Sequence, residues 1–266
     1  MSDSSGRIAQ LFLRYATPFA GVRRLPVIGP AVSWLSALIV PRDSLAWMQV
    51  QSGPAAGIWV HLNPRTGLQV FEGGGEPEVQ AALVKLLRPG MTFYDVGANI
   101  GFFSLLAARL VGKTGRVVAF EADPEVAARL REHAVRNEFS WLSVEQKAVC
   151  SGTGGVFFQR TDPAKSPDRG LGHVVESGTE NTIRVEGVSL DDFVKGAQGP
   201  DFVKCDVEGA EVDVFRGAER LLRGKRPGIL CEMHSNENMR VLREQFAAQN
   251  YESTLLDANH VLALPR

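Results

Sequence analysis

Residues 91–108 read MTFYDVGANIGFFSLLAA, and this stretch decides the fold. Its first apolar run is typical of a buried strand, the segment from Asp95 to Gly101 predicts a tight turn, and the apolar-rich run behind it predicts a helix. Because glycine lacks a Cβ, Gly97 and Gly101 let the backbone turn sharply and let a ligand lie against it, while free N–H groups at the helix start face that ligand. The stretch therefore predicts a strand-turn-helix nucleotide site.

The spacing of the glycines narrows the class of ligand. A dinucleotide fingerprint reads G-x-G-x-x-G, whereas these two glycines stand four positions apart, and Asn99 between them carries a side chain. Asp95 ends the strand and places a carboxylate where a cationic group can sit, which suits the ammonium of S-adenosylmethionine better than a phosphate. The alternative is a glycine-rich loop in an unrelated α/β domain.

Length and composition indicate one catalytic domain with an extension. The chain has 266 residues, 44% of them hydrophobic and 22% charged, and a formal net charge of -1, so it lacks the broad basic field that nucleic-acid binding needs. Its three cysteines form no C-x-x-C pair, which argues against a disulfide framework or a structural zinc site and indicates a reducing, cytoplasmic setting.

The region before the turn divides into an extension and a small β region. Residues 1–45 are expected to form a helical extension, and the uncharged segment 25–40 is expected to pack on the domain or close over the substrate cleft as a lid. That segment contains prolines and is too short for a transmembrane span, so the alternative is peripheral membrane contact. A single catalytic domain is expected over 46–266, with a β meander in 46–76 and the catalytic core in 77–266. The strands expected in the meander are 47–51, 58–62 and 68–71, and a helix is expected over 77–87.

The next strand, over residues 116–120, ends in Glu121. A carboxylate twenty residues beyond Gly101 at the end of the neighbouring strand can accept both hydroxyls of a ribose. A helix over 124–137 follows, with Asp123 as its N-cap. A third strand and its exit are expected over 143–149, and the exit at 146–148 is where an adenine ring can rest against backbone.

Residues 151–200 depart from strict alternation of strand and helix. Strands are expected over 156–159 and 182–188, on either side of the polar loop 161–172. A loop this long in a compact domain is usually functional or disordered. His173 follows it and can face a substrate, or it is a surface or packing residue.

A second group of polar residues follows two later strands. Asp206 and Glu208 come after the apolar run 202–205, and the strand over 227–234 carries Glu232 and His234. In an open α/β sheet, ligands bind outside the carboxyl ends of the strands, so these side chains are expected on the same rim as Glu121. The chain then predicts a helix over 237–250 and an antiparallel hairpin of strands 252–256 and 260–264.

Four motifs in this order resemble the FkbM family of S-adenosylmethionine-dependent methyltransferases. They are DVGANIG at 95–101, FEADP at 120–124, KCDVEGAE at 204–211 and EMH at 232–234. The resemblance runs roughly from Gly67 to the C-terminus and departs from the family at Ala122, where Pro is frequent, and at Cys205, where an aliphatic residue is frequent. It implies a class I, Rossmann-like methyltransferase fold, with a seven-stranded, mostly parallel sheet and a C-terminal antiparallel hairpin. It also implies O-methylation of a sugar, glycolipid or polyketide-like acceptor, as in natural product biosynthesis. The expected cofactor contacts are Asp95, Gly97, Ala98, Asn99, Gly101, Glu121, Ala122, Lys147, Ala148 and Asp206.

An alcohol acceptor must lose a proton as its oxygen attacks the methyl group. His234 is the first candidate for the base by its intrinsic pKa, and Asp206 or Glu208 is either an alternative base or the group that orients it. Glu211 is expected to be structural. In a rival arrangement, Asp206, Glu208 and Glu232 bind magnesium, which lowers the pKa of the acceptor hydroxyl; base catalysis without a metal is preferred.

Two other functions compete with methyl transfer. A nicotinamide-dependent oxidoreductase is favoured by the ribose acid but opposed by the glycine spacing and the terminal hairpin. A non-catalytic module that binds the cofactor is the third possibility. The expected partner is a small-molecule or glycolipid acceptor, in the cytoplasm or at the membrane surface.

Overall fold

The computed structural model describes residues 45–63, 67–161, 172–196 and 199–266, which fall into two compact units, Met1–Gly75 and Glu76–Arg266. The expected helical extension up to residue 44, with its segment 25–40, and most of the polar loop 161–172 lie outside the described residues. Within the described ranges, no helix has both the length and the apolar character needed to cross a bilayer. The single domain expected over 46–266 stays a prediction.

In the first unit, two of the three expected strands are confirmed. β1 (Ala46–Gln49) pairs antiparallel with β2 (Trp59–Leu62). The third strand, expected over 68–71, is wrong, because these residues form helix α3 (Leu68–Glu72). Four residues are too few to separate a strand pattern from one helical turn, and here the N–H of Phe71 bonds to the carbonyl of Gly67. The region is therefore a hairpin and a short helix rather than a meander.

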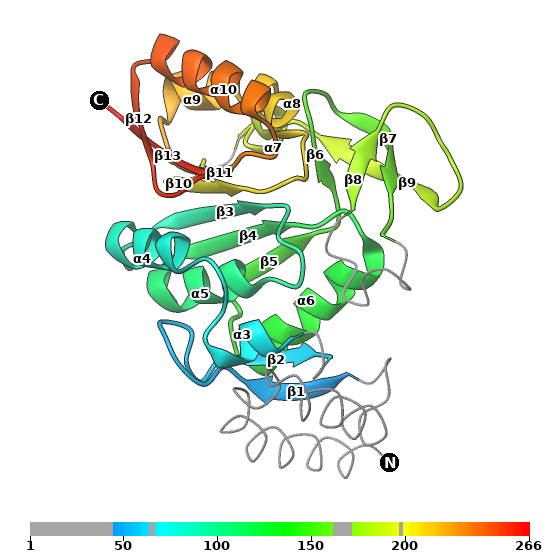
Figure 1. Cartoon of the computed structure of the whole chain (residues 1–266), viewed down its shortest axis with the longest axis vertical. Helices are drawn as coiled ribbons and strands as arrows, with labels where there is room; N and C mark the ends of the chain where they lie inside the picture. Colours follow the sequence, from blue (N-terminus) through cyan, green and yellow to red (C-terminus); the bar gives the residue numbers. More distant parts are fainter. Residues whose placement is uncertain (1–44, 64–66, 162–171, 197–198) are drawn as a thin grey trace, which may run out of the picture. The chain divides into compact units, whose positions relative to one another are not determined.

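The second unit is built on a seven-stranded sheet, as expected (Figure 1). In the described part of the chain its order is β12-β13-β11-β10-β3-β4-β5. Of these strands, β13 alone runs in the direction opposite to the other six. The first strand of this sheet along the chain, β3, lies in its middle between β10 and β4. The turn after β3 therefore lies beside the ends of β4 and β10. The strands are β3 (Thr92–Val96), β4 (Arg116–Phe120), β5 (Leu142–Glu145), β10 (Phe202–Cys205), β11 (Gly228–Glu232), β12 (Tyr251–Leu255) and β13 (His260–Pro265).

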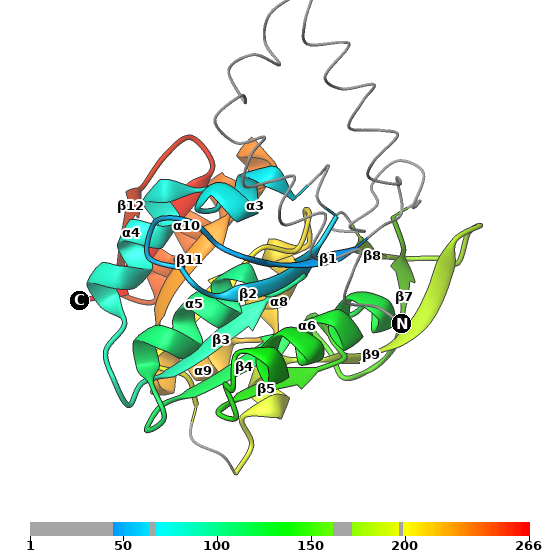
Figure 2. The same cartoon turned by 90° about the horizontal axis from the view of Figure 1, so that it is seen from below.

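Helices cover both faces of this sheet (Figures 1 and 2). Helices α4, α5 and α6 lie on one face, and α8, α9 and α10 on the other. Helix α6 begins where expected, because the Asp123 carboxylate accepts hydrogen bonds from the N–H groups of Glu125 and Val126. The helices are α4 (Pro77–Leu86), α5 (Phe102–Val111), α6 (Pro124–Arg136), α7 (Leu190–Phe193), α8 (Glu211–Arg216), α9 (Glu219–Gly224) and α10 (Asn236–Ala248).

A smaller sheet in the same unit, described as four strands, has the order β6-β9-β7-β8. Its strands β7 (Gly154–Gln159) and β9 (Thr182–Val188) match the expected strands and pair antiparallel. The third strand, expected to leave the sheet over 146–148, is confirmed as β5 (Leu142–Glu145), but the entry of the chain into a second sheet was not predicted. β5 ends at Glu145, the N–H of Lys147 turns back to the Glu145 carbonyl, and β6 (Ala148–Val149) joins the smaller sheet. The remaining strand, β8, is His173–Val175.

Candidate active site

The glycine turn after β3 is held by close packing on both sides. Gly97 and Gly101 have φ of 76° and 86°, in the left-handed region that favours glycine. A Cβ on Gly97 would lie 1.7 Å from the carbonyl oxygen of Asp206, and a Cβ on Gly101 would lie 1.9 Å from Cδ1 of Leu130. Both glycines are therefore needed to bring the end of β10 and helix α6 against the turn, as well as to shape the turn itself.

Glu121 at the end of β4 is fixed by that turn. Its two carboxylate oxygens accept hydrogen bonds from the N–H groups of Asn99 (2.8 Å) and Asp123 (2.7 Å), and the residue is 8% exposed. Burial raises the pKa of Glu121 to about 7, although both N–H groups favour the charged form. Each oxygen retains a lone pair for a ligand hydroxyl.

A cavity of about 420 Å³ opens beside Glu121 at the carboxyl ends of the strands. Ala98, Gly101 and Asp95, three of the expected cofactor contacts, are not among its described lining residues. The expected contacts that do line it are Gly97, Asn99, Glu121, Ala122, Lys147, Ala148 and Asp206.

Asp95 is fully buried and already faces a cation of the protein. Its Oδ2 accepts a hydrogen bond from the Ser104 hydroxyl (2.5 Å), and its Oδ1 lies 3.9 Å from Nζ of Lys204. Burial raises the pKa of Asp95, and Lys204 and Ser104 offset this only in part. Lys204 also donates to Asp206 (3.1 Å), so this buried lysine, which sequence reasoning missed, ties the ends of β3 and β10 together. The role of Asp95 toward a cationic ligand stays a prediction.

The expected rim of acids surrounds His234. From its Nε2, Glu208 lies at 3.4 Å, Asp206 at 3.8 Å and Glu232 at 4.0 Å, and all three acids line the cavity. His234 itself is not among the described lining residues, and its side chain is 23% exposed. Burial raises the pKa of Glu208; His234 opposes this, and Asp206 and Glu232 add to it. The site therefore concentrates negative charge next to one imidazole.

Glu211, not Asp206 or Glu208, makes the hydrogen bond that orients His234. Its Oε1 lies 2.7 Å from His234 Nδ1, and Glu211 is fully buried. The same carboxylate accepts from the N–H of Gly209 (2.7 Å) and from the side-chain amide of Asn238 (2.6 Å). Partial burial lowers the pKa of His234, but the hydrogen bond to Glu211 and the nearby carboxylates outweigh it, so the pKa is raised. The expected structural role of Glu211 thus includes holding the imidazole.

The acids around His234 do not form the group that the magnesium hypothesis expects. Asp206 and Glu232 form a group with His234 in which one ligand atom from each lies within 4.8 Å of the others, and Glu208 is not part of it. Nitrogen in such a group favours a transition metal over magnesium.

Among the described residues that line the cavity, three that are not glycine have left-handed backbone conformations. Glu76, Asn99 and Glu208 have φ of 56°, 51° and 53°. This conformation is uncommon outside glycine and clusters at functional sites, where the surrounding structure holds it in place.

Sequence reasoning missed much of the opposite wall, which the smaller sheet supplies. Phe158 of β7 packs with Ala122 and Ala148 in an apolar cluster. His173, for which a substrate-facing role and a surface or packing role were both open, lines the cavity in β8. The available signal was the short apolar run Val156-Phe157-Phe158. The lining residues not expected as contacts include Glu76, Phe120, Val149, Phe158, Gly172, Val174, Val207 and Ala210.

Comparisons with known proteins converge on one family. The family model described as the methyltransferase FkbM domain matches residues 95–255. The hexuronic acid methyltransferase AglP of Haloferax volcanii is 26% identical over 163 residues, which are 60% of this chain and 63% of AglP. The 31-O-demethyl-FK506 methyltransferase FkbM of Streptomyces tacrolimicus is 29% identical, over 56% of this chain and 67% of that protein. The 2-O-methyltransferase NoeI of Sinorhizobium fredii is 26% identical, over 56% of this chain and 66% of NoeI. The matched region therefore spans slightly under two thirds of AglP and about two thirds of the other two relatives.

Proposed function

We propose that this chain, which belongs to the FkbM methyltransferase domain family, transfers a methyl group from S-adenosylmethionine to a hydroxyl oxygen of a sugar, glycolipid or polyketide-like acceptor. The observation that carries the proposal is the cavity between Glu121 and the acids around His234. It is lined by a carboxylate suited to a ribose and by the acids that surround an imidazole suited to an alcohol proton.

The residues present fit the adenosine part of the cofactor. Glu121 keeps a lone pair on each oxygen for the two ribose hydroxyls, and its carboxylate is fixed by backbone N–H groups. Ala122, Ala148 and Phe158 offer an apolar surface for the adenine ring next to it. When bound, the cofactor supplies an electrophilic methyl group.

His234 takes the acceptor proton through Nε2 in this proposal. The hydrogen bond from Nδ1 to Glu211 fixes the ring orientation and stabilises the imidazolium that forms. Because the pKa of His234 is raised, the ring is a stronger base than a free imidazole but is neutral in a smaller fraction of molecules at low pH. Asp206 and Glu208, on the Nε2 side, remain alternative bases.

The acceptor class rests on the relatives. Their names give a hexuronic acid, 31-O-demethyl-FK506 and a 2-O position, which supports an oxygen acceptor on a sugar or a polyketide-like molecule.

Cofactor class is tested by titration calorimetry at pH 8, where Glu121 is ionised. We expect S-adenosylhomocysteine to bind and NADH not to bind. Glu121→Gln should weaken binding about tenfold or more, because a hydrogen bond to a charged group contributes about 1.5–3 kcal/mol. Glu138→Gln, the same change on an exposed loop, should leave the affinity unchanged.

Transfer itself is tested with a labelled methyl donor and three acceptors: a methyl glucuronoside, a methyl glucoside and a macrolide with a free hydroxyl. Label on an acceptor oxygen supports the proposal. Cofactor binding without transfer to any of them would favour the non-catalytic module, and NADH binding in place of S-adenosylhomocysteine would favour the oxidoreductase.

A further inference from the structure

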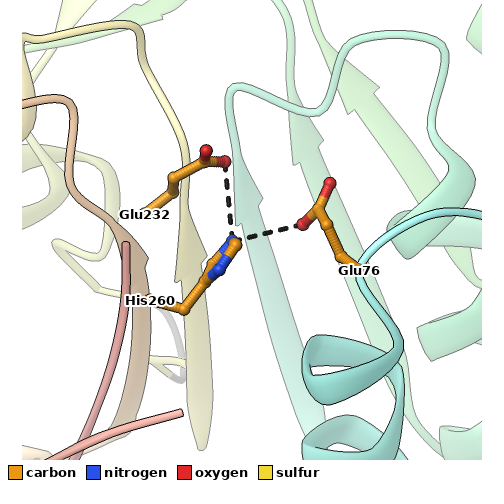
Figure 3. A group of neighbouring side chains, drawn as sticks. All are labelled: Glu76, Glu232 and His260. Carbon is orange, nitrogen blue, oxygen red and sulfur yellow. Dashed lines mark ion pairs between the residues drawn. The ribbon is translucent and has the colours of Figure 1, made fainter. Parts of the chain in front are cut away.

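A second group of side chains converges beside the cavity, from three elements (Figure 3). Glu76 stands at the N-cap of α4, Glu232 is the last residue of β11, and His260 is the first residue of β13, directly opposite Glu232 in the antiparallel register. Nε2 of His260 lies 3.3 Å from Oε2 of Glu76 and 3.6 Å from Oε2 of Glu232. Figure 3 shows both carboxylates directed at the same ring nitrogen.

His260 is almost completely buried, yet this nitrogen makes no hydrogen bond within the described part of the chain. The residue is 5% exposed, and among the described residues neither its Nε2 nor Oε2 of Glu76 has a hydrogen-bond partner. Its other nitrogen, Nδ1, lies 2.8 Å from Oδ2 of Asp257. When the ring is neutral, Nδ1–H donates to Asp257, so that the Nε2 lone pair points between the two glutamates. Two carboxylates and a lone pair directed at one point require a cation there.

We propose that Glu76, Glu232 and His260 form a binding site for a divalent transition-metal ion, such as Mn²⁺ or Zn²⁺. Metal-to-ligand distances of about 2.0–2.2 Å place neighbouring ligand atoms about 3.0–3.6 Å apart, which matches the two measured separations. One imidazole nitrogen with two carboxylate oxygens selects such ions over magnesium or calcium. Asp257 supplies the carboxylate that commonly orients a metal-binding histidine.

The neighbouring group of Asp206, Glu232 and His234 fits an ion less well. There the Nε2-to-oxygen separations are 3.8 and 4.0 Å, longer than the 3.3 and 3.6 Å at His260. In the proposed site, Glu76 and Glu232 also line the cavity, so the ion's remaining positions face the space where the acceptor would lie. An oxygen of the acceptor can then complete the coordination. The binding of the ion itself does not depend on the proposed methyl transfer.

Burial lowers the pKa of His260, but the carboxylates of Glu232, Glu76 and Asp257 outweigh it and raise the pKa to about 10. A metal ion would therefore compete with a proton for Nε2.

The experiment titrates the full chain, stripped of metal by a chelator, with Mn²⁺ followed by electron paramagnetic resonance and with Zn²⁺ in competition with a chromophoric chelator. We expect one tight site per chain. His260→Asn and Glu76→Gln should each weaken it at least tenfold. Glu78→Gln, the same change on an exposed residue two positions along α4, should leave it intact.

Two further variants separate the neighbouring groups, because Glu232 belongs to both. Asp206→Asn and His234→Asn should retain the tight site. The proposal is overturned if those two variants lose the ion while His260→Asn and Glu76→Gln keep it, or if the wild-type chain binds neither ion. Circular dichroism of every variant reports folding, and Glu76→Gln keeps the test decisive if His260→Asn does not fold. Calorimetry with S-adenosylhomocysteine, done without metal, shows separately whether the cofactor proposal holds.

Discussion

His234 and Glu211 form a pair whose two members have different tasks. Glu211 is completely buried and accepts three hydrogen bonds, so its position is set by the backbone of Gly209 and the amide of Asn238 as much as by the imidazole. His234 is partly open and presents Nε2 toward the acids that line the cavity. Glu211 is therefore a positioning residue, and its effect on the reaction passes through the histidine.

The variant Glu211→Gln should slow methyl transfer and also shift its pH dependence. Glu211 raises the pKa of His234, so its removal lowers that pKa, and the acidic limb of the kcat/KM profile should move to lower pH. The rates of wild type and variant, measured from pH 5 to 9, check this. A loss of activity with an unmoved acidic limb would mean that Glu211 acts only by holding the fold. His234→Gln should remove the limb and lower the rate by about 10²-fold or more.

At the scale of elements, the glycine turn joins β3 to α5 and also supports two other elements. The Gly97 Cα packs against the backbone of Asp206 after β10, whereas the Gly101 Cα packs against the side chain of Leu130 in α6. A backbone oxygen cannot move without displacing its strand, while a leucine side chain can change its rotamer. The two glycines should therefore differ in how much they tolerate a methyl group.

Denaturant unfolding of three alanine variants tests this difference. Gly112→Ala should cost only about 1–3 kcal/mol, from backbone strain alone at φ 65° and ψ -176°, because no atom of the described residues lies within 4 Å of the added Cβ. Gly101→Ala should cost more, and Gly97→Ala most, above about 4 kcal/mol or enough to prevent folding. Equal losses for Gly97→Ala and Gly112→Ala would contradict the packing argument.

The elements that could be predicted share a simple signal. β3, β4, β10, β11 and the terminal hairpin are confirmed because each is an apolar run next to a glycine, a proline or a polar turn. The strand predicted over 68–71 was wrong because four residues are too few to show whether the apolar pattern has the period of a strand or of a helix. The helix that forms there depends on a hydrogen bond from the N–H of Phe71 to the carbonyl of Gly67. The change of sheet between Glu145 and Ala148 was not predicted, because local sequence does not encode which strand becomes the partner.

At the scale of the whole molecule, Glu121 links the site to the stability of the fold. Its pKa is about 7 in the folded chain against an ordinary value of 4.5, so the folded state binds more protons than the unfolded state between these values. The contribution of this group to stability is therefore complete below pH 4.5 and is lost as the pH rises to 7. A shift of this size corresponds to about 3 kcal/mol, since one pKa unit is about 1.4 kcal/mol.

Unfolding free energies of wild type and Glu121→Gln, measured from pH 4 to 8, check this dependence. The variant cannot titrate, so its stability relative to wild type should rise by about 3 kcal/mol across that range, on top of a constant loss from the missing acceptor. Glu138→Gln should run parallel to wild type. Parallel curves for Glu121→Gln would show that Glu121 ionises normally.

The rim of the site could be predicted from the sequence, but its internal pairing could not. Strand ends of a parallel sheet meet at one edge, which is why Asp206, Glu208 and Glu232 were expected together. That Glu211 bonds to His234, or that Glu76 meets His260, depends on side-chain direction and on the register of β13 against β11. Such contacts join residues far apart in the chain and leave no periodic signal.

The left-handed conformations of Glu76, Asn99 and Glu208 have a consequence for laboratory evolution of this protein. Each such residue costs about 1–3 kcal/mol that a glycine would avoid, and Glu208 adds the repulsion of the surrounding carboxylates. Selection for thermal stability alone should therefore favour replacements at these positions. Such replacements would remove side chains that line the cavity. At these three residues a gain in thermal stability is expected to lower activity, so a selection scheme has to select for both.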